Sequence, residues 1–277
     1  MATQAILQLK SGEQKKNNLL LIVPYLSGTI VQMISSQKMS ALDLNGNYYI
    51  QTPEFLAIRL DQENQYKDSQ PIKKIFSGNS SLVGRLLLTQ KGPFNSLREI
   101  GESIAKRGVG LSVSTISKVL TRLEEELIVQ KEDNQIRLIQ SDKLLDQFKE
   151  EYVPPKIEEI IKIMVPDPFS LLKEKFPTLA WSLTGESSAY RYTVTTPPKV
   201  FSVYVTDLIN LDADPNERFP NLILKQTGEL PVYFDRLKED GLNFSSKLQS
   251  YLELSQLDKR EKEIAQGIRD DILSNLK

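Results

Sequence analysis

The stretch LSVSTISKVLTRLEEEL, residues 111–127, decides how the middle of the chain is expected to fold. Its apolar residues recur at the helical spacing of i, i+3, i+4 and i+7, which predicts an amphipathic helix from about residue 113 to residue 126. Thr115, Lys118 and Arg122 share the opposite face of that helix. The stripe expected to enter a core consists of Ile116, Val119, Leu120, Leu123 and Leu127.

A second helix is predicted just ahead of this one, in SLREIGESIAKRG, residues 96–108. It opens with a capping box, in which the side chains of Ser96 and Glu99 each bond the other residue's backbone N–H. Its apolar residues are expected to pack against the stripe of the third helix, and these are Leu97, Ile100 and Ile104.

The order of the surrounding elements is typical of a winged helix-turn-helix. A helix is predicted over residues 81–90, and RGVG at 107–110 is a glycine-bearing turn between the second and third helices. The segment LIVQKEDNQIRLI, residues 127–139, predicts a hairpin around Asp133 and Asn134. A closing helix in 141–152 is expected to be capped by Ser141 or Asp142.

Local charge favours DNA as the partner of this segment, although the whole chain carries a net charge of only −1. From residue 85 to residue 122 there are seven cations and two acids, a net of +5, namely Arg85, Lys91, Arg98, Lys106, Arg107, Lys118 and Arg122 against Glu99 and Glu102. The alternative is a segment used for packing or dimerisation, with a merely hydrated polar face. The expected DNA contacts, to phosphates or base edges, are Arg98, Lys106, Arg107, Ser112, Ser114, Thr115, Ser117, Lys118, Thr121, Arg122, Lys131 and Arg137.

A small α/β domain is predicted over residues 1–65, followed by a polar linker over 66–80. Residues 19–26 are expected to form a buried strand, and Ser27 is expected to cap a helix after it. Asn45-Gly46 is a turn signal between apolar runs. Three more strands are expected near residues 40–44, 47–51 and 55–60.

This first domain looks like a degenerate nuclease core. Such a core holds Mg²⁺ with an Asp on one strand and a Glu-x-Lys-like pair on the next. Asp43 occupies the first position, but the next strand offers Ala57-Ile58-Arg59, which has no carboxylate and no lysine. We therefore expect no metal site, and we interpret Asp43 as a residue that stabilises the turn.

After the stiff VPPK break at residues 153–156, the predicted third domain covers 153–277 and ends in helical residues from 244 onward. SLTGESSAY followed by KVFSVYVTD resembles a nucleotidyltransferase-like fold, whose active site needs two alternating carboxylates on one strand. The strand here has no acid before Asp207, so the domain is expected to be inactive. Trp181 is expected in its core.

Composition excludes several kinds of chemistry. The chain has no cysteine and no histidine, which excludes disulfides, thiolate or imidazole metal sites and histidine-based catalysis. No cofactor, no metal and no enzymatic activity are expected. The first residues lack the pattern of a signal peptide, and no apolar run is long enough to span a bilayer, so a soluble cytoplasmic protein without membrane contact is expected.

Residues 81–152 are similar to the winged-helix segment of bacterial regulators grouped with the AbiEi-type antitoxins of type IV toxin–antitoxin systems. The similarity extends to LDLNGNYYIQTPEFLAIRL at 42–60 and to WSLTGESSAYRY at 181–192. The turn in KRGVGLSV is one residue longer than is usual in that family. The resemblance implies sequence-specific DNA binding and transcriptional repression, often by a dimer.

The expectation is thus an α/β multi-domain protein with a central winged helix that binds double-stranded operator DNA as a homodimer and represses transcription. Two alternatives stay open. One is an antitoxin or accessory protein that acts by contact with a toxin or another protein. The other is a Mg²⁺-dependent nuclease or nucleotidyltransferase, which would lose activity on substitution of Asp43 or Asp207.

Overall fold

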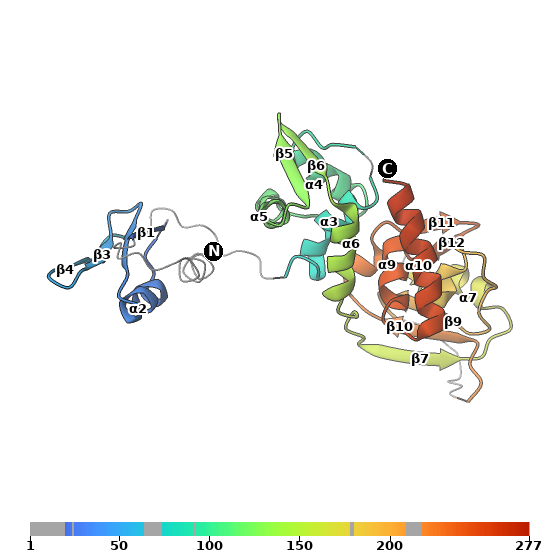
Figure 1. The fold of residues 1–277 in the computed structure, drawn as a ribbon. Helices are drawn as coiled ribbons and strands as arrows, with labels where there is room; N and C mark the ends of the chain where they lie inside the picture. Colours follow the sequence, from blue (N-terminus) through green and yellow to red (C-terminus); the bar gives the residue numbers. More distant parts are fainter. Residues whose placement is uncertain are drawn as a thin grey trace. The chain divides into compact units, whose positions relative to one another are not determined.

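The protein is a mixed α/β structure in a computed structural model that describes residues 20–23, 25–63, 74–90, 92–177, 180–208 and 218–276 (Figure 1). The chain divides into two compact units, Met1–Gln70 and Pro71–Lys277, and each unit is considered by itself. Lys91, one of the cations counted above, and most of the expected linker lie outside the described residues. No helix in the described part of the chain combines the length and apolar character needed to cross a membrane.

The first unit is a four-stranded sheet with one helix. Strand order is β1-β2-β3-β4, with β1 and β2 parallel and the other pairs antiparallel. The crossover helix α2 begins after Ser27, whose hydroxyl accepts a hydrogen bond from the N–H of Ile30, as predicted. The elements are β1 (Leu20–Val23), α2 (Gly28–Ser36), β2 (Ser40–Asp43), β3 (Tyr48–Gln51) and β4 (Leu56–Arg59).

The second unit begins with helices and a hairpin in the predicted order. Phe94 pairs with the hairpin through an isolated β-bridge, in which its N–H and carbonyl both bond Ile136, at 2.9 and 2.7 Å. The elements are η1 (Gly78–Ser80), α3 (Ser81–Leu87), α4 (Leu97–Ala105), α5 (Val113–Glu125), β5 (Val129–Glu132), β6 (Gln135–Leu138) and α6 (Ser141–Glu150).

Two predicted helix starts differ in detail. At α4 the Ser96 hydroxyl accepts the N–H of Glu99, but the Glu99 carboxylate accepts the N–H of Asn95 rather than that of Ser96. At α6 the N-cap is Gln140, without a side-chain capping bond, so the prediction of Ser141 or Asp142 as the cap was wrong. Asp142 instead lies in the first turn, where its charge complements the helix dipole.

The end of α5 corrects the predicted apolar stripe. Leu127 is 65% exposed, because the helix has ended and this residue adopts a left-handed backbone with a φ of 60°. The N–H of Ile128 then bonds the carbonyl of Leu123 at 2.9 Å, in the manner of a Schellman motif. Ile128 therefore takes the buried place that the periodicity assigned to Leu127.

The rest of the second unit is built on a mixed six-stranded sheet of order β11-β12-β8-β9-β10-β7. One face packs against α7: Leu172 of the helix and Phe176, which follows its last residue, are buried with Trp181, as predicted for the tryptophan. The expected helical end contains two helices separated at residues 255–258. The elements are β7 (Glu159–Ile163), α7 (Pro168–Lys175), β8 (Trp181–Leu183), α8 (Glu186–Ala189), β9 (Phe201–Val205), β10 (Leu222–Gln226), η2 (Leu230–Tyr233), β11 (Leu237–Glu239), β12 (Leu242–Phe244), α9 (Lys247–Leu254) and α10 (Lys259–Ser274).

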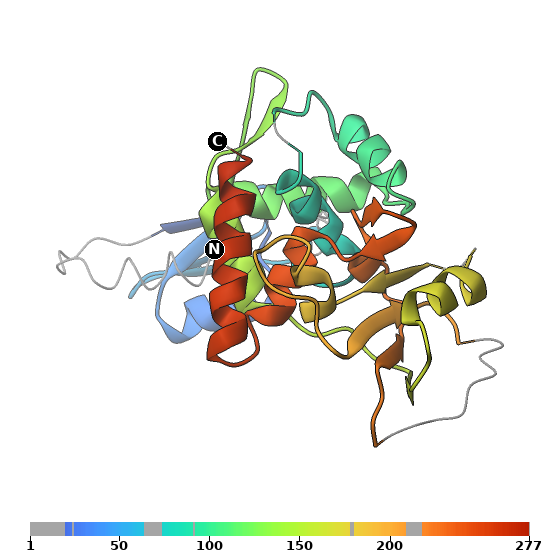
Figure 2. The ribbon, with the colours of Figure 1, turned by 90° about the vertical axis from the view of Figure 1, so that its right-hand side faces the viewer.

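One hydrophobic core joins the segment around α5 to the C-terminal helices. It runs from Ile75 and Phe76 through α3, α4, α5 and α6 to Ile268 and Ile272 of α10. Figures 1 and 2 both show α10 alongside α9. Residues 75 and 76 of the expected linker are core residues, and residues 81–152 share their core with the following segment.

Candidate nucleic-acid interface

The α4–turn–α5 segment positions the candidate interface. The turn contains Gly108, with a φ of +86° that glycine adopts without strain. Ser112 then caps α5 by accepting the N–H of Thr115 at 3.2 Å, and its hydroxyl also bonds the hydroxyl of Ser114. Because Ser112 acts as the cap, its expected role toward DNA competes with a structural one.

The inward face of α5 is fixed by close packing. Ile116, Val119, Leu120 and Leu123 are at most 1% exposed, as the periodicity predicted apart from Leu127. Gly101 of α4 lets the two helices approach, because a Cβ at that position would lie 3.3 Å from Ile116 Cδ1. The rotation of α5 about its axis is therefore set by the core, and so is the direction of its outer face.

The outer face of α5 carries the predicted hydroxyls and cations. Ser114, Thr121 and Arg122 are exposed, and Thr115, Ser117 and Lys118 are half-buried. Arg122 pairs with Glu126 at 2.7 Å and with Glu125 at 3.6 Å. The ammonium of Lys118 has no hydrogen-bond or ion-pair partner among the residues that the structure describes, and the same holds for Lys106 at the end of α4.

The other expected contacts divide into solvent-facing and internal ones. Arg98 and its i+4 partner Glu102 are both exposed, with their side chains 2.9 Å apart. Arg107 points inward: it pairs with Asp235 at 2.9 Å, lies over the ring of Phe234 and donates to the Ser103 carbonyl. Arg107 therefore holds the turn against the C-terminal part of the unit.

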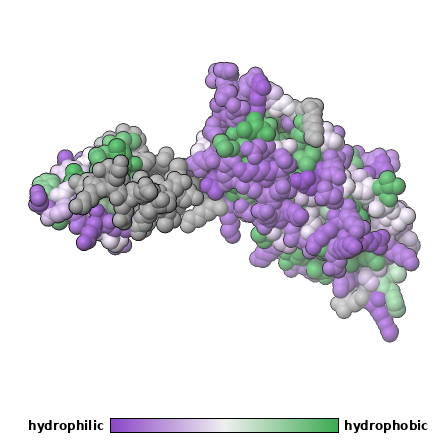
Figure 3. Space-filling view, in the orientation of Figure 1, coloured by the Kyte–Doolittle hydropathy of each residue, from purple (hydrophilic) through white to green (hydrophobic). Residues whose placement is uncertain are grey.

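The β5–β6 hairpin presents a hydrophilic tip, seen in Figure 3 as purple atoms at the upper edge. Lys131 pairs with Glu124 at 2.7 Å, and Arg137 donates to Gln135 of the same hairpin. A partly exposed ion pair such as Lys131–Glu124 contributes on the order of 0.5 kcal/mol, and its cation exchanges readily to other anions. The cationic side chains of the hairpin and of α5 can therefore leave their present partners and bind a phosphate at little cost in free energy.

Local charge is weaker than the sequence count implied. Arg85 contributes to the +5 but is only 4% exposed, so it adds nothing to the surface charge. Glu124, Glu125 and Glu126 neutralise Lys131 and Arg122 in the absence of a partner. The cations on this surface without an ion pair among the described residues are Lys106, Lys118 and Arg137, and Arg137 bonds only the neutral Gln135.

Asp43 of the first unit has the role expected of a turn residue. Its carboxylate accepts hydrogen bonds from the N–H groups of Leu26, Asn45 and Asn47 and from the Asn47 side chain, all at 2.8–2.9 Å. Burial acts to raise the pKa of Asp43, but these bonds outweigh it and hold the pKa below its usual value of 3.8. No cluster of three or more metal-ligating side chains occurs among the described residues.

The turn after β8 was compared in the sequence with a nucleotidyltransferase site. Here Glu253 of α9 bonds the hydroxyl of Thr184 and accepts the N–H of Gly185 at 2.7 Å. Gln249 donates to the same carboxyl group at 2.7 Å and to the hydroxyl of Tyr152. These hydrogen bonds hold the turn against α9, and we interpret them as a structural network.

That network continues to Arg85 of α3, which sequence reasoning missed as a site residue. Its Nη2 donates to Gln249 Oε1 at 2.9 Å across 164 residues of sequence, and its Nε donates to Ser81. Burial lowers the pKa of Arg85 to about 10. One local signal was present: SLVGRLLL places a single charge inside an otherwise apolar helix.

Comparison with known proteins adds no family to this geometry. No family model, no curated protein and no solved structure matches the chain.

Proposed function

We propose that this protein is a DNA-binding transcriptional regulator, most simply a repressor, whose segment from α3 to β6 acts as a winged helix. The observation that carries the proposal is the outer face of α5. Its Thr115, Lys118 and Arg122 share one side and are open to solvent to differing degrees, while the opposite side is locked into a core.

In the proposed complex α5 lies in the major groove. Lys118 and Arg122 are long enough to reach phosphates or guanine edges, and Thr115 and Thr121 supply short hydroxyls that bond bases or phosphates. Phosphate oxygens replace Glu125 and Glu126 as partners of Arg122. The β5–β6 hairpin lies beside the groove and contacts the backbone through Arg137.

We further propose that the chain binds its operator as a homodimer in the cytoplasm. The first unit supplies a suitable apolar surface, because Leu20 and Ile22 of β1 alternate with the buried Leu21 and Val23 and are 50% and 62% exposed. A two-fold dimer doubles the DNA contacts and reads a symmetric site. Light scattering of the full chain tests this part by its mass.

A protein-contact function is the second candidate, favoured by the pairing of Arg122 and Lys131 with three neighbouring glutamates. A surface of balanced charge suits an antitoxin that binds a toxin or another protein. An enzymatic role has less support, because Asp43 is already engaged by four donors.

The decisive experiment selects genomic fragments bound by the purified chain and then measures affinity for the enriched duplex by fluorescence anisotropy. The variant Lys118→Ala/Arg122→Ala should bind at least about tenfold more weakly, and its log K against log[salt] slope should be shallower by about 2. The matched control is Lys162→Ala/Lys238→Ala, which removes two exposed cations from the C-terminal sheet.

Failure to enrich any fragment would end the regulator proposal and leave the protein-contact candidate. Equal affinity of the α5 variant and the control would keep DNA binding but remove α5 from the interface. Circular dichroism of each variant shows that a loss of binding is not a loss of fold.

A further inference from the structure

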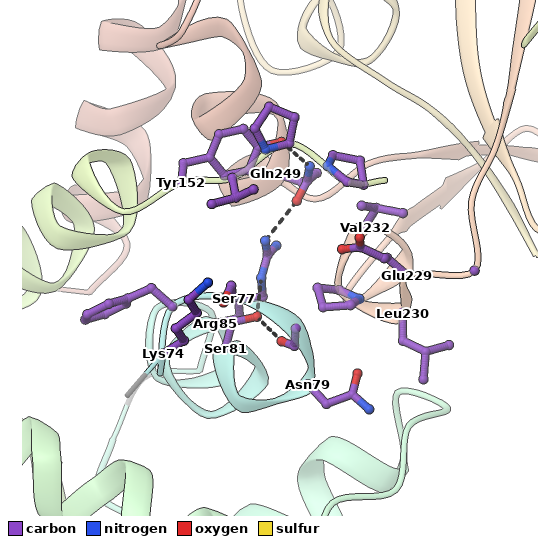
Figure 4. Close-up of a pocket in the computed structure, with 17 residues that line it drawn as sticks. Lys74, Ser77, Asn79, Ser81, Arg85, Tyr152, Glu229, Leu230, Val232 and Gln249 are labelled. Atoms are coloured by element: carbon purple, nitrogen blue, oxygen red, sulfur yellow. Dashed lines mark hydrogen bonds between the residues drawn. The ribbon is translucent and has the colours of Figure 1, made fainter. Parts of the chain in front are cut away.

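The strongest unassigned feature is a pocket between η1, α3, η2 and α9, with a cavity volume of about 450 Å³. Volumes of this size hold small organic ligands. The pocket lies beside α3, on elements far apart in sequence, and Figure 4 shows Arg85 rising from α3 toward Gln249 between its walls. Lys74 and Asn79 belong to the same wall as α3.

Arg85 in this pocket is a buried cation with no carboxylate paired directly with it among the described residues, and the acid whose charge acts on it, Glu253, is connected to it only through Gln249. Its Nη1 is buried and has no hydrogen bond to any described residue, and its other donors reach only the neutral Gln249 and Ser81. The guanidinium carbon also lies 5.9 Å from the centroid of the Phe148 ring. Buried charges in proteins are normally paired with a counter-charge and fully hydrogen-bonded, because desolvation of a lone ion is costly.

The remaining walls define what else a ligand must carry. Pro154, Pro155, Pro231 and Val232 give the pocket an apolar surface. Glu229 lies on the wall opposite α3, and one of its oxygens accepts the N–H of Lys156. Lys74 adds a second cation at the exposed edge. The walls thus combine two cations, an apolar surface and one acid.

We propose that this pocket binds a small organic oxyanion, a carboxylate or phosphate on an apolar or aromatic body that also carries a hydrogen-bond donor. The oxyanion pairs with Arg85 at the floor and Lys74 at the edge, the body lies against the prolines, and the donor faces Glu229. A guanidinium fork suits either oxyanion, since both offer two acceptor oxygens.

Occupancy of this pocket also bears on α5. Arg85 belongs to α3, which shares its core with α4 and α5, and its partner Gln249 belongs to α9. A ligand that pairs with Arg85 competes with Gln249 for the guanidinium. It therefore changes the link between the α5 segment and the C-terminal helices, which gives an effector a physical route to the outer face of α5.

The test measures binding to the full chain by calorimetry and thermal shift, with no DNA present. The probes are two matched pairs, 4-aminobenzoate with the neutral 4-aminobenzamide and adenosine monophosphate with adenosine, together with inorganic phosphate. At least one anionic member should bind, and its neutral partner should bind at least about tenfold more weakly, since the guanidinium loses its counter-charge. The two pairs separate a carboxylate from a phosphate ligand.

The variant Lys74→Glu should weaken that binding at least about tenfold, and Arg85→Met should abolish it. Lys238→Glu makes the same change of charge at an exposed site outside the pocket and should leave binding unchanged. If Arg85→Met does not fold, Lys74→Glu against Lys238→Glu decides the question.

Three results would overturn the proposal: no anionic probe binds at millimolar concentration, each anion and its neutral partner bind equally, or Lys74→Glu binds as the wild type does. Because the measurement involves no DNA, its outcome is independent of whether the protein is a regulator.

Discussion

Arg85 and Arg122 belong to the same packed segment, yet the chain treats their charges in opposite ways. Arg122 is half exposed and has two glutamates within 3.6 Å, and water reaches the guanidinium and the carboxylate of Glu125. Arg85 is buried, has no carboxylate paired with it in the described chain and leaves one nitrogen without a hydrogen bond. Arg122 can therefore exchange its glutamate partners for another anion, whereas the buried guanidinium of Arg85 keeps one nitrogen without a hydrogen-bond partner.

The contrast shows what the burial of a cationic side chain implies about its role. An exposed charged side chain contributes little to the free energy of folding and is free to bind a phosphate of a nucleic acid. A charge inside a core is kept at a cost, and Asp43 of the first unit shows the usual solution, a buried carboxylate with four donors. Arg85 departs from that solution, which is why we assign it a ligand.

The largest expected effect separates the two arginines directly. Arg85→Ala should lower the free energy of unfolding by about 3 kcal/mol, because it empties a buried volume beside Phe148. Arg122→Ala should cost less than about 0.5 kcal/mol, the range of an exposed pair. Urea unfolding followed by the fluorescence of Trp181, the one tryptophan of the chain, reports on this unit. Equal costs would remove the distinction drawn between the two sites.

A smaller effect is expected from the packing around Arg85. A Cβ on Gly84 would lie 2.8 Å from the buried ring of Phe148, so Gly84→Ala should cost about 2 kcal/mol through overpacking. Gly267 of α10 has nothing within 4 Å of a Cβ, and Gly267→Ala should stabilise the chain by about 0.5–1 kcal/mol through helix propensity. Thermal unfolding of both variants measures the difference, and a stabilising Gly84→Ala would contradict the packing described.

The stability contributed by the buried, hydrogen-bonded carboxylate of Asp43 should depend on pH. The folded pKa of Asp43 is lowered, so its contribution to stability is fully present above about pH 3.8 and is lost as the pH falls through the folded value. Asp43→Ala should cost about 1–2 kcal/mol by leaving backbone N–H groups unpaired. Hydrogen exchange at Leu26, Asn45 and Asn47 measures both effects, and the exposed Asp61→Ala should leave exchange there unchanged.

The smallest effect concerns the exchangeable pair. Glu125→Gln/Glu126→Gln removes the internal competitors for Arg122 and should tighten binding to the enriched duplex by about 0.5 kcal/mol, roughly twofold. Glu150→Gln/Glu151→Gln, at the exposed end of α6, raises the net charge equally and serves as the control. Tighter binding by both variants to the same degree would point to net charge rather than to Arg122.

Local periodicity was enough to predict most of the helices and the hairpin. The stripe from Ile116 to Leu123, the turn at Gly108 and the cap at Ser27 all follow from residues close in sequence, and the structure has them. Leu127 was misplaced because periodicity alone does not mark where a helix stops. The actual end depends on a left-handed residue that is not a glycine.

Long-range pairing set the limit of what the sequence could predict. The bond from Arg85 to Gln249 and the ion pair from Arg107 to Asp235 join residues more than 100 positions apart. No local pattern reveals such partners, so Arg107 was assigned to DNA and the pocket was not foreseen. The core that extends from residue 75 to residue 272 was not predicted for the same reason: the sequence indicated several apolar faces, but not which of them pack together.

The buried Ile268 and Ile272 have a consequence for the gene as well as for the fold. A premature stop codon ahead of α10 would remove Ile268 and Ile272 from the core that sets the orientation of α5, although the codons for α5 itself stay intact. Reading-frame lesions near the 3′ end should therefore have the same phenotype as lesions in α5. An excised fragment ending at residue 152 should aggregate rather than serve as a minimal binding module.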